Sequence, residues 1–182
     1  RFSLSIGFGA VLISFSIGVL IGTVSGYYHR LDLVIQRLVD IMLAFPSILL
    51  AIGIVAALGP GFLNTIIVIG VTEVPGFIRL ARSSVLSIRE REFVTAARAL
   101  GARDGRIMLR HVLPSMVSPI VVFASLRVAS ALLTGATLSF LGLGVPPPRP
   151  EWGAMINTAR NALRTAPHTF LIPTAILFVA VM

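Results

Sequence analysis

The densest group of side chains that could do chemistry in this sequence lies in one polar stretch, residues 79–114. The stretch contains eight arginines and three acids, whereas the segments on either side carry almost no charge. Arginine and carboxylate groups make charge-assisted hydrogen bonds, so such a stretch is suited to binding another surface in water. A soluble protein would spread these residues over all its surface elements. The pattern instead indicates one loop of a membrane protein that projects into water and contacts something there.

No other grouping supports covalent chemistry or metal binding. The chain has no cysteine, and its three histidines, His29, His111 and His168, are far apart in sequence without the spacing of metal ligands. No serine lies in a nucleophile motif. All fifteen basic residues are arginine, so the lysine of a phosphate-binding loop is missing as well. We therefore expect no catalytic residue, no metal and no cofactor bound by this chain.

The composition is typical of an integral membrane protein. Hydrophobic residues make up 56% of the chain, charged residues 12%, and the mean hydropathy is +0.96. Long continuous apolar runs predict helices, because a membrane-spanning barrel would alternate apolar and polar residues. A net charge of +8 could indicate a nucleic-acid partner. Arginine-rich cytoplasmic loops explain it better, so we expect a lipid bilayer and no nucleic acid as the surroundings.

The apolar runs predict an all-α, polytopic bundle with about five spans. The predicted helices are 2–28, 34–58, 62–82 and 115–143, then a short interfacial helix within 151–164, and a last apolar run from 170 to 182. A Leu-Gly-Pro-Gly turn at 58–61 separates the second helix from the third. In the first helix, Gly18, Gly22 and Gly26 predict close packing against another helix.

Arginine counts predict the orientation. Residues 79–111 hold eight arginines, 59–62 hold none and 144–168 hold three. The loop 83–114 is therefore expected in the cytoplasm, and the proline-rich segment with its short helix, 144–168, outside. Asp40 lies near the interface, and we expect it to pair with Arg37.

Within the polar loop the pattern predicts two short helices. Ser87 and Glu90 have the spacing of a capping box, and Glu92 follows in the first turn. Phe93, Ala97 and Leu100 then fall on one face, and Gly101 allows a left-handed cap. A second helix is expected from 104 or 105 to 111, closed by Pro114. An amphipathic helix lying on lipid headgroups is the alternative to docking on a protein.

Several separated motifs resemble one family. Thr95, Ala96, Ala97, Gly101, Leu113 and Pro114 are spaced as in the "EAA" loop of bacterial ABC importer permeases. The other motifs resemble the dipeptide, oligopeptide and nickel branch, at the second permease of the pair. They are RLVDI at 37–41 with AFP at 44–46, EFVTAARALGA at 92–102 with RHVLP at 110–114, and LSFLGLG at 138–144 with PP at 147–148 and EWG at 151–153. The chain departs from the general pattern at Thr95, where Glu is usual, and at His111, where Ile is usual, which leaves Glu92 as the expected acidic contact.

The resemblance implies a single permease domain over 1–182, in the inner membrane of a bacterium or archaeon. It implies six spans in the full chain, with a helix and an outer domain before Arg1 and an amphiphilic tail after Met182. The expected partners are a second permease, two ATP-binding subunits that hold ATP, and an external substrate-binding protein. The loop residues expected to couple to the ATPases are Glu92, Thr95, Ala96, Ala97, Gly101, Leu113 and Pro114.

The implied function is import of di- and oligopeptides by alternating access, without covalent chemistry. Nickel, glutathione or another small solute are alternative cargoes. Glu73 and Arg127 fall inside apolar segments, where they could contact the two ends of a peptide or form an ion pair with each other; we favour the ion pair. An ion-driven secondary transporter would need more acids near the midplane. A membrane-embedded enzyme would need a cluster of catalytic groups.

Overall fold

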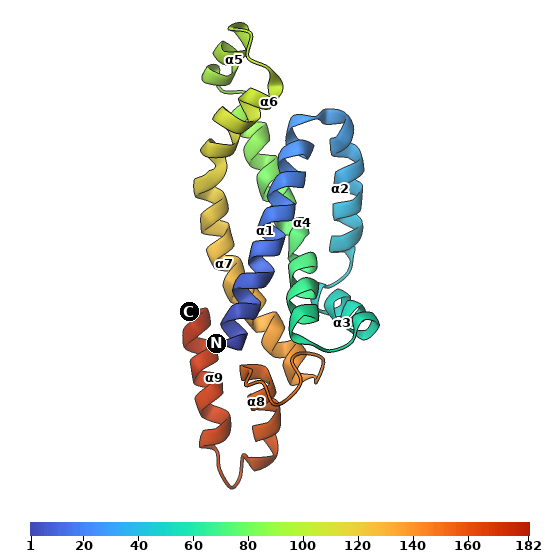
Figure 1. The fold of residues 1–182 in the computed structure, drawn as a ribbon, viewed down its shortest axis with the longest axis vertical. Helices are drawn as coiled ribbons and strands as arrows, with labels where there is room; N and C mark the ends of the chain where they lie inside the picture. Colours follow the sequence, from blue (N-terminus) through green and yellow to red (C-terminus); the bar gives the residue numbers. More distant parts are fainter. The chain divides into compact units, whose positions relative to one another are not determined.

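The computed structural model describes all of residues 1–182, and every regular element in it is helical. The α-helices are α1 (Phe2–Tyr27), α2 (His29–Ala44), α3 (Ser47–Leu58), α4 (Phe62–Arg89), α5 (Glu92–Ala99), α6 (Asp104–Ile107), α7 (Leu113–Phe140), α8 (Trp152–Ala159) and α9 (His168–Val181). A π-helical turn, Met108–Val112, joins α6 to α7, and a 3₁₀ turn, Arg160–Ala162, follows α8 (Figure 1). The expected all-α fold is confirmed.

Three helices are long and apolar enough to cross a membrane. They are Phe2–Tyr27, Phe62–Arg89 and the continuous helix Asp104–Phe140. The pair α2 and α3 passes the same test only when the two are taken together, with a bend of 90° between them, and α9 is a shorter apolar helix. The structure therefore offers three or four spans, where the sequence predicted about five.

Pro46 breaks the single helix that we predicted over 34–58. The chain leaves α2 after Ala44 and enters α3 at Ser47. Proline has no N–H to donate within a helix, and its ring disfavours helical backbone at the preceding residue, Phe45. The predicted turn after residue 58 is confirmed, since Gly59 has a φ of 82° and the Asn64 side chain donates to the carbonyl oxygens of Leu58 and Gly59.

Helix α4 runs to Arg89 rather than ending near 82, because its buried stripe continues. Phe77, Ala81, Val85 and Ile88 are all buried at helical spacing. Ser87 therefore lies inside α4, and α5 begins at Glu92 without a side-chain cap. The predicted capping box at 87–90 was wrong.

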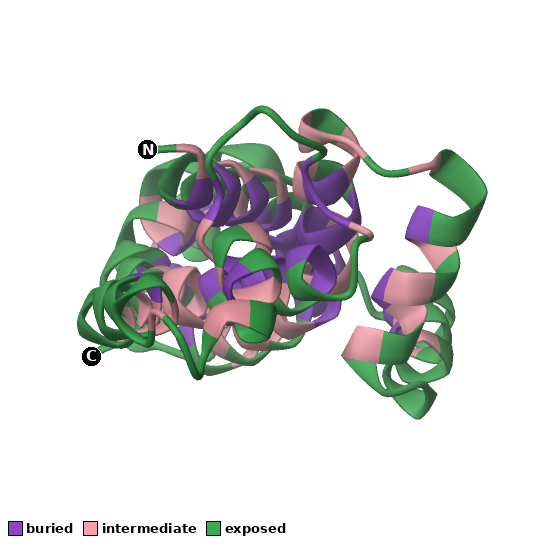
Figure 2. Ribbon diagram, turned by 90° about the horizontal axis from the view of Figure 1, so that it is seen from below, coloured by how far each residue is buried: buried purple, intermediate pink, exposed green.

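The helices divide between two compact units, and α1, α4 and α7 contribute to both. The first unit contains residues 1–13, 45–73 and 125–182, and the second contains 14–44 and 74–124. Helices bury one side and expose the other, as expected where lipid or a partner covers the outer side (Figure 2).

In the first unit, small residues and one buried acid organise the packing. A Cβ at Gly135 would lie 3.2 Å from a methyl group of Ile6, so α7 and α1 are close there. The carboxylate of Glu151 is buried, accepts the N–H of Ala154 at 2.9 Å and the hydroxyl of Ser3 at 3.2 Å, and so caps α8 while holding it to α1. Helices α8 and α9 form an antiparallel hairpin, which confirms the short helix expected after residue 151 (Figure 1).

In the second unit, the glycine stripe of α1 packs against α4, as predicted. A Cβ at Gly22 would lie 2.5 Å from the carbonyl oxygen of Ile78, and one at Gly26 would lie 2.8 Å from Cβ of Val85. Only glycine permits this separation, which brings the two helix backbones close together.

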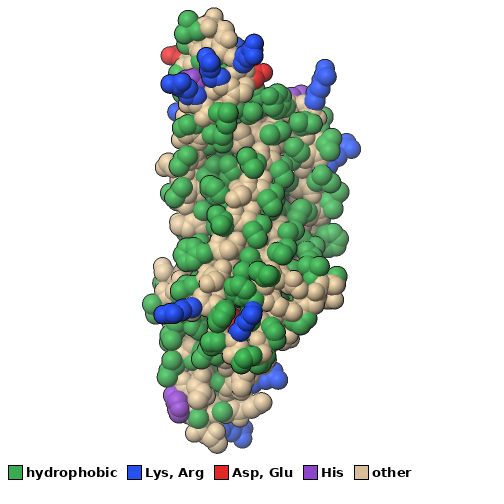
Figure 3. Space-filling model, viewed as in Figure 1, with side chains coloured by type: hydrophobic (Ala, Val, Ile, Leu, Met, Phe, Trp, Pro, Cys, Tyr) green, Lys and Arg blue, Asp and Glu red, His purple; other side chains and the backbone are tan.

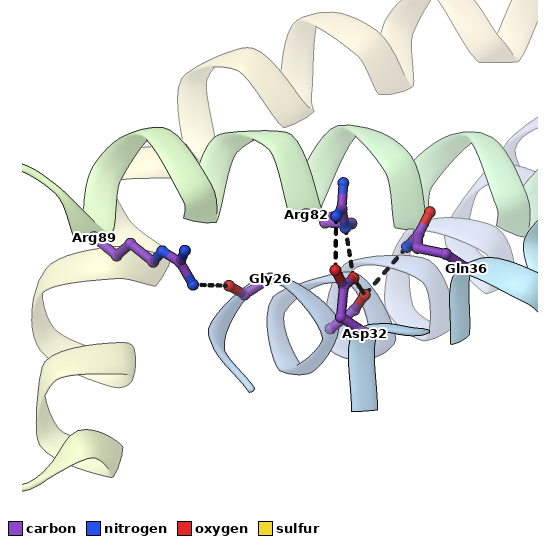
Figure 4. A network of polar contacts seen from close by, with 6 residues as sticks. Gly26, Asp32, Gln36, Arg82 and Arg89 are labelled. Atoms are coloured by element: carbon purple, nitrogen blue, oxygen red, sulfur yellow. Dashed lines mark hydrogen bonds and ion pairs between the residues drawn. The ribbon is translucent and has the colours of Figure 1, made fainter. Parts of the chain in front are cut away.

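A polar network fixes α2 onto the same two helices (Figure 4). Asp32 is 7% exposed and accepts two hydrogen bonds from the Arg82 guanidinium, at 2.5 and 2.6 Å. The Ser25 hydroxyl donates to Asp32 at 2.6 Å and accepts from the Gln36 amide at 3.1 Å. The arrangement leaves both oxygens of a buried carboxylate hydrogen-bonded, as burial of a charge requires.

A second ion pair also joins α2 to α4, but at the surface. Asp40 lies 2.6 Å from Arg79, with side chains 64% and 52% exposed. The predicted pairing of Asp40 with Arg37 was wrong, because packing of α2 on α4 brings Arg79 within reach of the carboxylate.

Replacing Gly22 with alanine should destabilise the protein. The new methyl group would overlap Ile78 and Ala81, and overpacking of this kind costs about 1–3 kcal/mol. Thermal unfolding of the purified protein in detergent should show a lower midpoint. The control is Gly53→Ala in α3, where a Cβ meets nothing within 4 Å, so its midpoint should stay the same or rise.

The two Asp–Arg pairs should differ in their contribution to stability. Asp32→Ala leaves the Arg82 guanidinium without its two partly buried hydrogen bonds and should lower the free energy of unfolding by about 2–3 kcal/mol. Asp40→Ala removes an exposed pair and should cost less than about 1 kcal/mol. Denaturant unfolding of both variants provides the comparison, and equal losses would contradict this account.

Candidate functional site

The candidate site is the segment between α4 and α7, which carries α5 and α6. Only Glu90 and Arg91 separate the end of α4 from the start of α5. Glu92 occupies the first turn of α5, as predicted, where the positive end of the helix dipole favours a carboxylate. Glu90 lies before the helix rather than in it.

Gly101 ends α5 in the way the sequence predicted. Its φ is 79°, and its N–H donates to the carbonyl of Arg98 at 3.0 Å, while the N–H of Ala102 donates to Ala97 at 3.1 Å. These two bonds form a Schellman motif, which satisfies the last carbonyls of the helix. The left-handed backbone that the motif requires strains any residue with a Cβ, so the glycine fixes a sharp turn from α5 towards α6.

The predicted stop at Pro114 was wrong, because the helix passes through it. Residues 104–140 form one continuous helix, with the π-helical turn at Met108–Val112 and Pro114 near the start of α7. The N–H of Leu113 donates to the carbonyl of Met108, five residues back. A π turn directly before a proline accommodates the missing i to i−4 hydrogen bond without ending the helix.

The expected coupling residues fall in three places. Ala96, Ala97 and Gly101 line a groove of about 430 Å³ between α5 and the start of the long helix, together with Phe93, Leu100, Ala102, Arg106 and His111. Glu92 and Thr95 are exposed on α5 outside this groove. Leu113 and Pro114 line a separate apolar pocket of about 420 Å³ with residues of α1 and α7. The role of these residues in coupling stays a prediction.

The groove is apolar although it lies in the charged loop. Leu100 is 89% exposed and Phe93 is 41% exposed, on the shared face that the i, i+4, i+7 spacing predicted. The sequence did not predict that Arg106 and His111 join them, because α6 and the π turn reach the groove only through the turn at Gly101. Exposed apolar side chains beside positive charge are typical of a protein-binding surface.

Arginine side chains gather around α5 and α6 (Figure 3). Those exposed there are Arg91, Arg98, Arg103, Arg106 and Arg110. Arg98 donates to the Tyr27 hydroxyl at 3.3 Å, and this hydrogen bond raises the pKa of the guanidinium. The loop therefore presents a permanently positive surface, suited to an acidic partner.

Glu73 and Arg127 meet in the first unit. Both lie near the middle of their helices, α4 and α7, and Glu73 Oε2 is 3.1 Å from Arg127 Nη1. The Glu73 side chain is 12% exposed and that of Arg127 is 34% exposed. The structure thus forms the ion pair we favoured, and any contact with substrate stays a prediction. No group of three or more His, Cys, Asp or Glu side chains is placed to hold a metal ion.

Several known proteins are similar in sequence to this chain over most or all of its length. A protein family described as the binding-protein-dependent transport system inner membrane component matches residues 15–182. The dipeptide transport system permease protein DppC of Alkalihalophilus pseudofirmus is 50% identical over 95% of this chain and 57% of its own length. The glutathione transport system permease protein GsiD of Pectobacterium atrosepticum is 43% identical over 100% of this chain and 61% of its own length. The chain thus spans about six-tenths of the length of these relatives.

Solved structures with low sequence identity have the same fold. The MetNI methionine ABC transporter, in an inward-facing conformation, gives a TM-score of 0.80 at 18% identity, over 98% of this chain and 88% of that chain. An amino acid ABC transporter gives 0.69 at 17% identity, over 98% of this chain and 84% of that chain.

The family match covers nearly the whole chain, and the relatives and the fold agree with it. The description of this family places its members in the inner membrane. The three or four apolar helices that could cross a membrane agree with a multi-pass protein. The loop motif resembles that of the same kind of protein. This chain belongs to the family of inner-membrane components of binding-protein-dependent transport systems.

Proposed function

We propose that this chain is the membrane-spanning permease subunit of an ATP-driven importer of peptides. The observation that carries the proposal is its 50% identity, over 95% of the chain, to a protein named as a dipeptide transport permease. The chain works with a second, similar permease, two ATP-binding subunits that hold and hydrolyse ATP, and a substrate-binding protein outside the membrane. It binds no cofactor itself.

The loop 83–114 lies in the cytoplasm and docks on an ATP-binding subunit through the apolar groove of α5. Two features support this role. Leu100 and Phe93 are exposed in a charged loop, and exposed apolar side chains of this kind favour a partner that covers them. In addition, α5 follows α4 after two residues and leads through the Gly101 turn into a helix that continues to Phe140, so a displacement of α5 moves both spans.

Transport then follows alternating access. The ATP-binding subunits close on ATP, the loop moves with them, and the attached helices rock until the path faces outward. The proline-rich segment and α8, 144–168, face the binding protein. An ion-driven mechanism is less well supported, because Glu73 is the one acid near the middle of a spanning helix and it is paired with Arg127.

Glutathione is the second candidate cargo. Proteins named as glutathione permeases are 43% and 45% identical over the whole of this chain. Glutathione is itself a tripeptide, so both cargoes need a path that accepts charged termini and a peptide backbone. Nickel and other small solutes remain alternatives on the family resemblance alone.

A cysteine placed at Ala96 should crosslink to an ATP-binding subunit. The chain has no cysteine of its own, and Ala96 is exposed in the α5 groove. In membranes containing the complete transporter, a crosslink at this position should form and should change in yield on addition of ATP. Ser83→Cys, exposed on α4 outside the groove, is the matched control and should not crosslink. Free labelling of residue 96 by a water-soluble reagent, without any crosslink, would mean that α5 is a bare surface helix.

Glu73→Gln should reduce the import of all peptides alike, because it leaves Arg127 without its ionic partner within the membrane. The measurement is the ratio between the uptake of a dipeptide with a free amino group and the uptake of its N-acetylated form. This ratio should be the same in the variant and in the unmodified protein. The double variant Glu73→Gln with Arg127→Gln should recover stability, since no unpaired charge remains. A changed ratio would instead assign Glu73 to the peptide amino group.

A further inference from the structure

The last turn of α1 contacts α2, the end of α4 and, through Tyr27, both short helices of the docking loop. Three consecutive residues there each make a polar contact. Ser25 joins the network of Asp32, and the carbonyl oxygen of Gly26 accepts a hydrogen bond from Arg89, the last residue of α4, at 3.2 Å (Figure 4). Tyr27 contacts the helices that follow, α5 and α6.

Tyr27 connects the two arms of the loop through a single oxygen atom. Its hydroxyl donates to Asp104 Oδ1, in the first residue of α6, at 2.6 Å. The same oxygen accepts from Arg98 Nη2, in the last turn of α5, at 3.3 Å. A hydroxyl can donate one hydrogen bond and accept others, so it can lie between an acid and a guanidinium and satisfy both. The two partners lie on either side of the turn at Gly101.

Little else restrains α5. Val94 is the one buried residue of its eight, and Ile107 is the one buried residue of α6. The ring of Phe93 lies 6.2 Å from that of His111, which is a loose contact. Apolar packing holds this short helix at one residue, Val94, so specific polar contacts are needed to determine its orientation.

We propose that Tyr27 is a positioning residue for coupling: its hydroxyl holds α5 and α6 at a fixed angle to the end of α1, so that movement of α5 on an ATP-binding subunit is transmitted to the spanning helices. The effect on transport rests on the proposed function, whereas the positioning of α5 and α6 by Tyr27 does not depend on that function. Tyr27 touches neither ATP nor cargo, and acts through the loop.

Tyr27→Phe keeps the ring and removes the hydroxyl. Loss of the hydroxyl removes the hydrogen bonds with both Asp104 and Arg98, and should raise the fraction of molecules with displaced α5 by at least roughly two- to tenfold. Spin labels on cysteines at Leu20 in α1 and Ala99 in α5, both exposed, should report a broader distance distribution in the variant. The complete chain in lipid nanodiscs suffices for this measurement, without ATP or partner subunits.

The control is Tyr28→Phe. Tyr28 is the neighbouring residue, its ring packs edge-on against that of Tyr27 at 5.3 Å, and its hydroxyl makes no hydrogen bond in the structure. The distance distribution should be unchanged. Asp104→Ala removes only the shorter of the two hydrogen bonds of Tyr27 and should broaden the distribution in the same direction, and the double variant should be no worse than Tyr27→Phe alone, because the phenylalanine already lacks both bonds.

The second readout is the number of peptides imported per ATP hydrolysed by the complete transporter. Tyr27→Phe should lower this ratio while assembly with the ATP-binding subunits is retained, and Tyr28→Phe should leave it unchanged. An unchanged distance distribution in Tyr27→Phe overturns the positioning role, whatever the transporter does. A broadened distribution with an unchanged ratio overturns the coupling role. A transporter that imports no peptide refutes the proposed function and leaves the distance result to be judged separately.

Discussion

The structure depends on one constraint, the lack of water in a bilayer to hydrogen-bond the peptide backbone. Each spanning segment must pair its own N–H and C=O groups, so the segments form long helices. Between α2 and α4 the chain turns where proline or glycine permits it: the bend between α2 and α3 is at Pro46, and Gly59 after α3 has a positive φ. Pro114 shows the limit of this rule, because a π turn lets the helix pass through it.

The bilayer also affects how the helices pack against one another. Lipid tails are as apolar as the helix surfaces, so burial alone does not bring two helices together, and contact must come from shape and from polar bonds. In the second unit both are present. The glycines of α1 allow α4 to come near, and Asp32 of α2 accepts two hydrogen bonds from Arg82 of α4. In the first unit Glu73 and Arg127 form a comparable pair between α4 and α7.

The loop 83–114, for which we propose a docking role, is held differently from the spanning helices. Its short helices bury one residue each, and their exposed face combines Leu100 and Phe93 with several arginines. A surface of this kind gains stability only when a partner covers it. Its orientation is therefore sensitive to a few polar bonds, and Tyr27, in the last turn of α1, supplies two of them, to Asp104 and from Arg98. Ser25 and Gly26 of the same turn bond to Asp32 in α2 and to Arg89 at the end of α4, so the loop and the spans are held at one place.

The sequence alone predicted the membrane class of the protein, the first spanning helix, the glycine stripe, the left-handed turn at Gly101 and the apolar face of α5. These features follow from local composition and spacing, which act through neighbouring residues. The structure was needed to show that the helix continues through Pro114, because the π turn before it accommodates the missing hydrogen bond. It was also needed to show that Asp40 pairs with Arg79 and that Tyr27 meets both Arg98 and Asp104. These partners are far apart in sequence, and the packing of helices, which no local pattern encodes, brings them into contact.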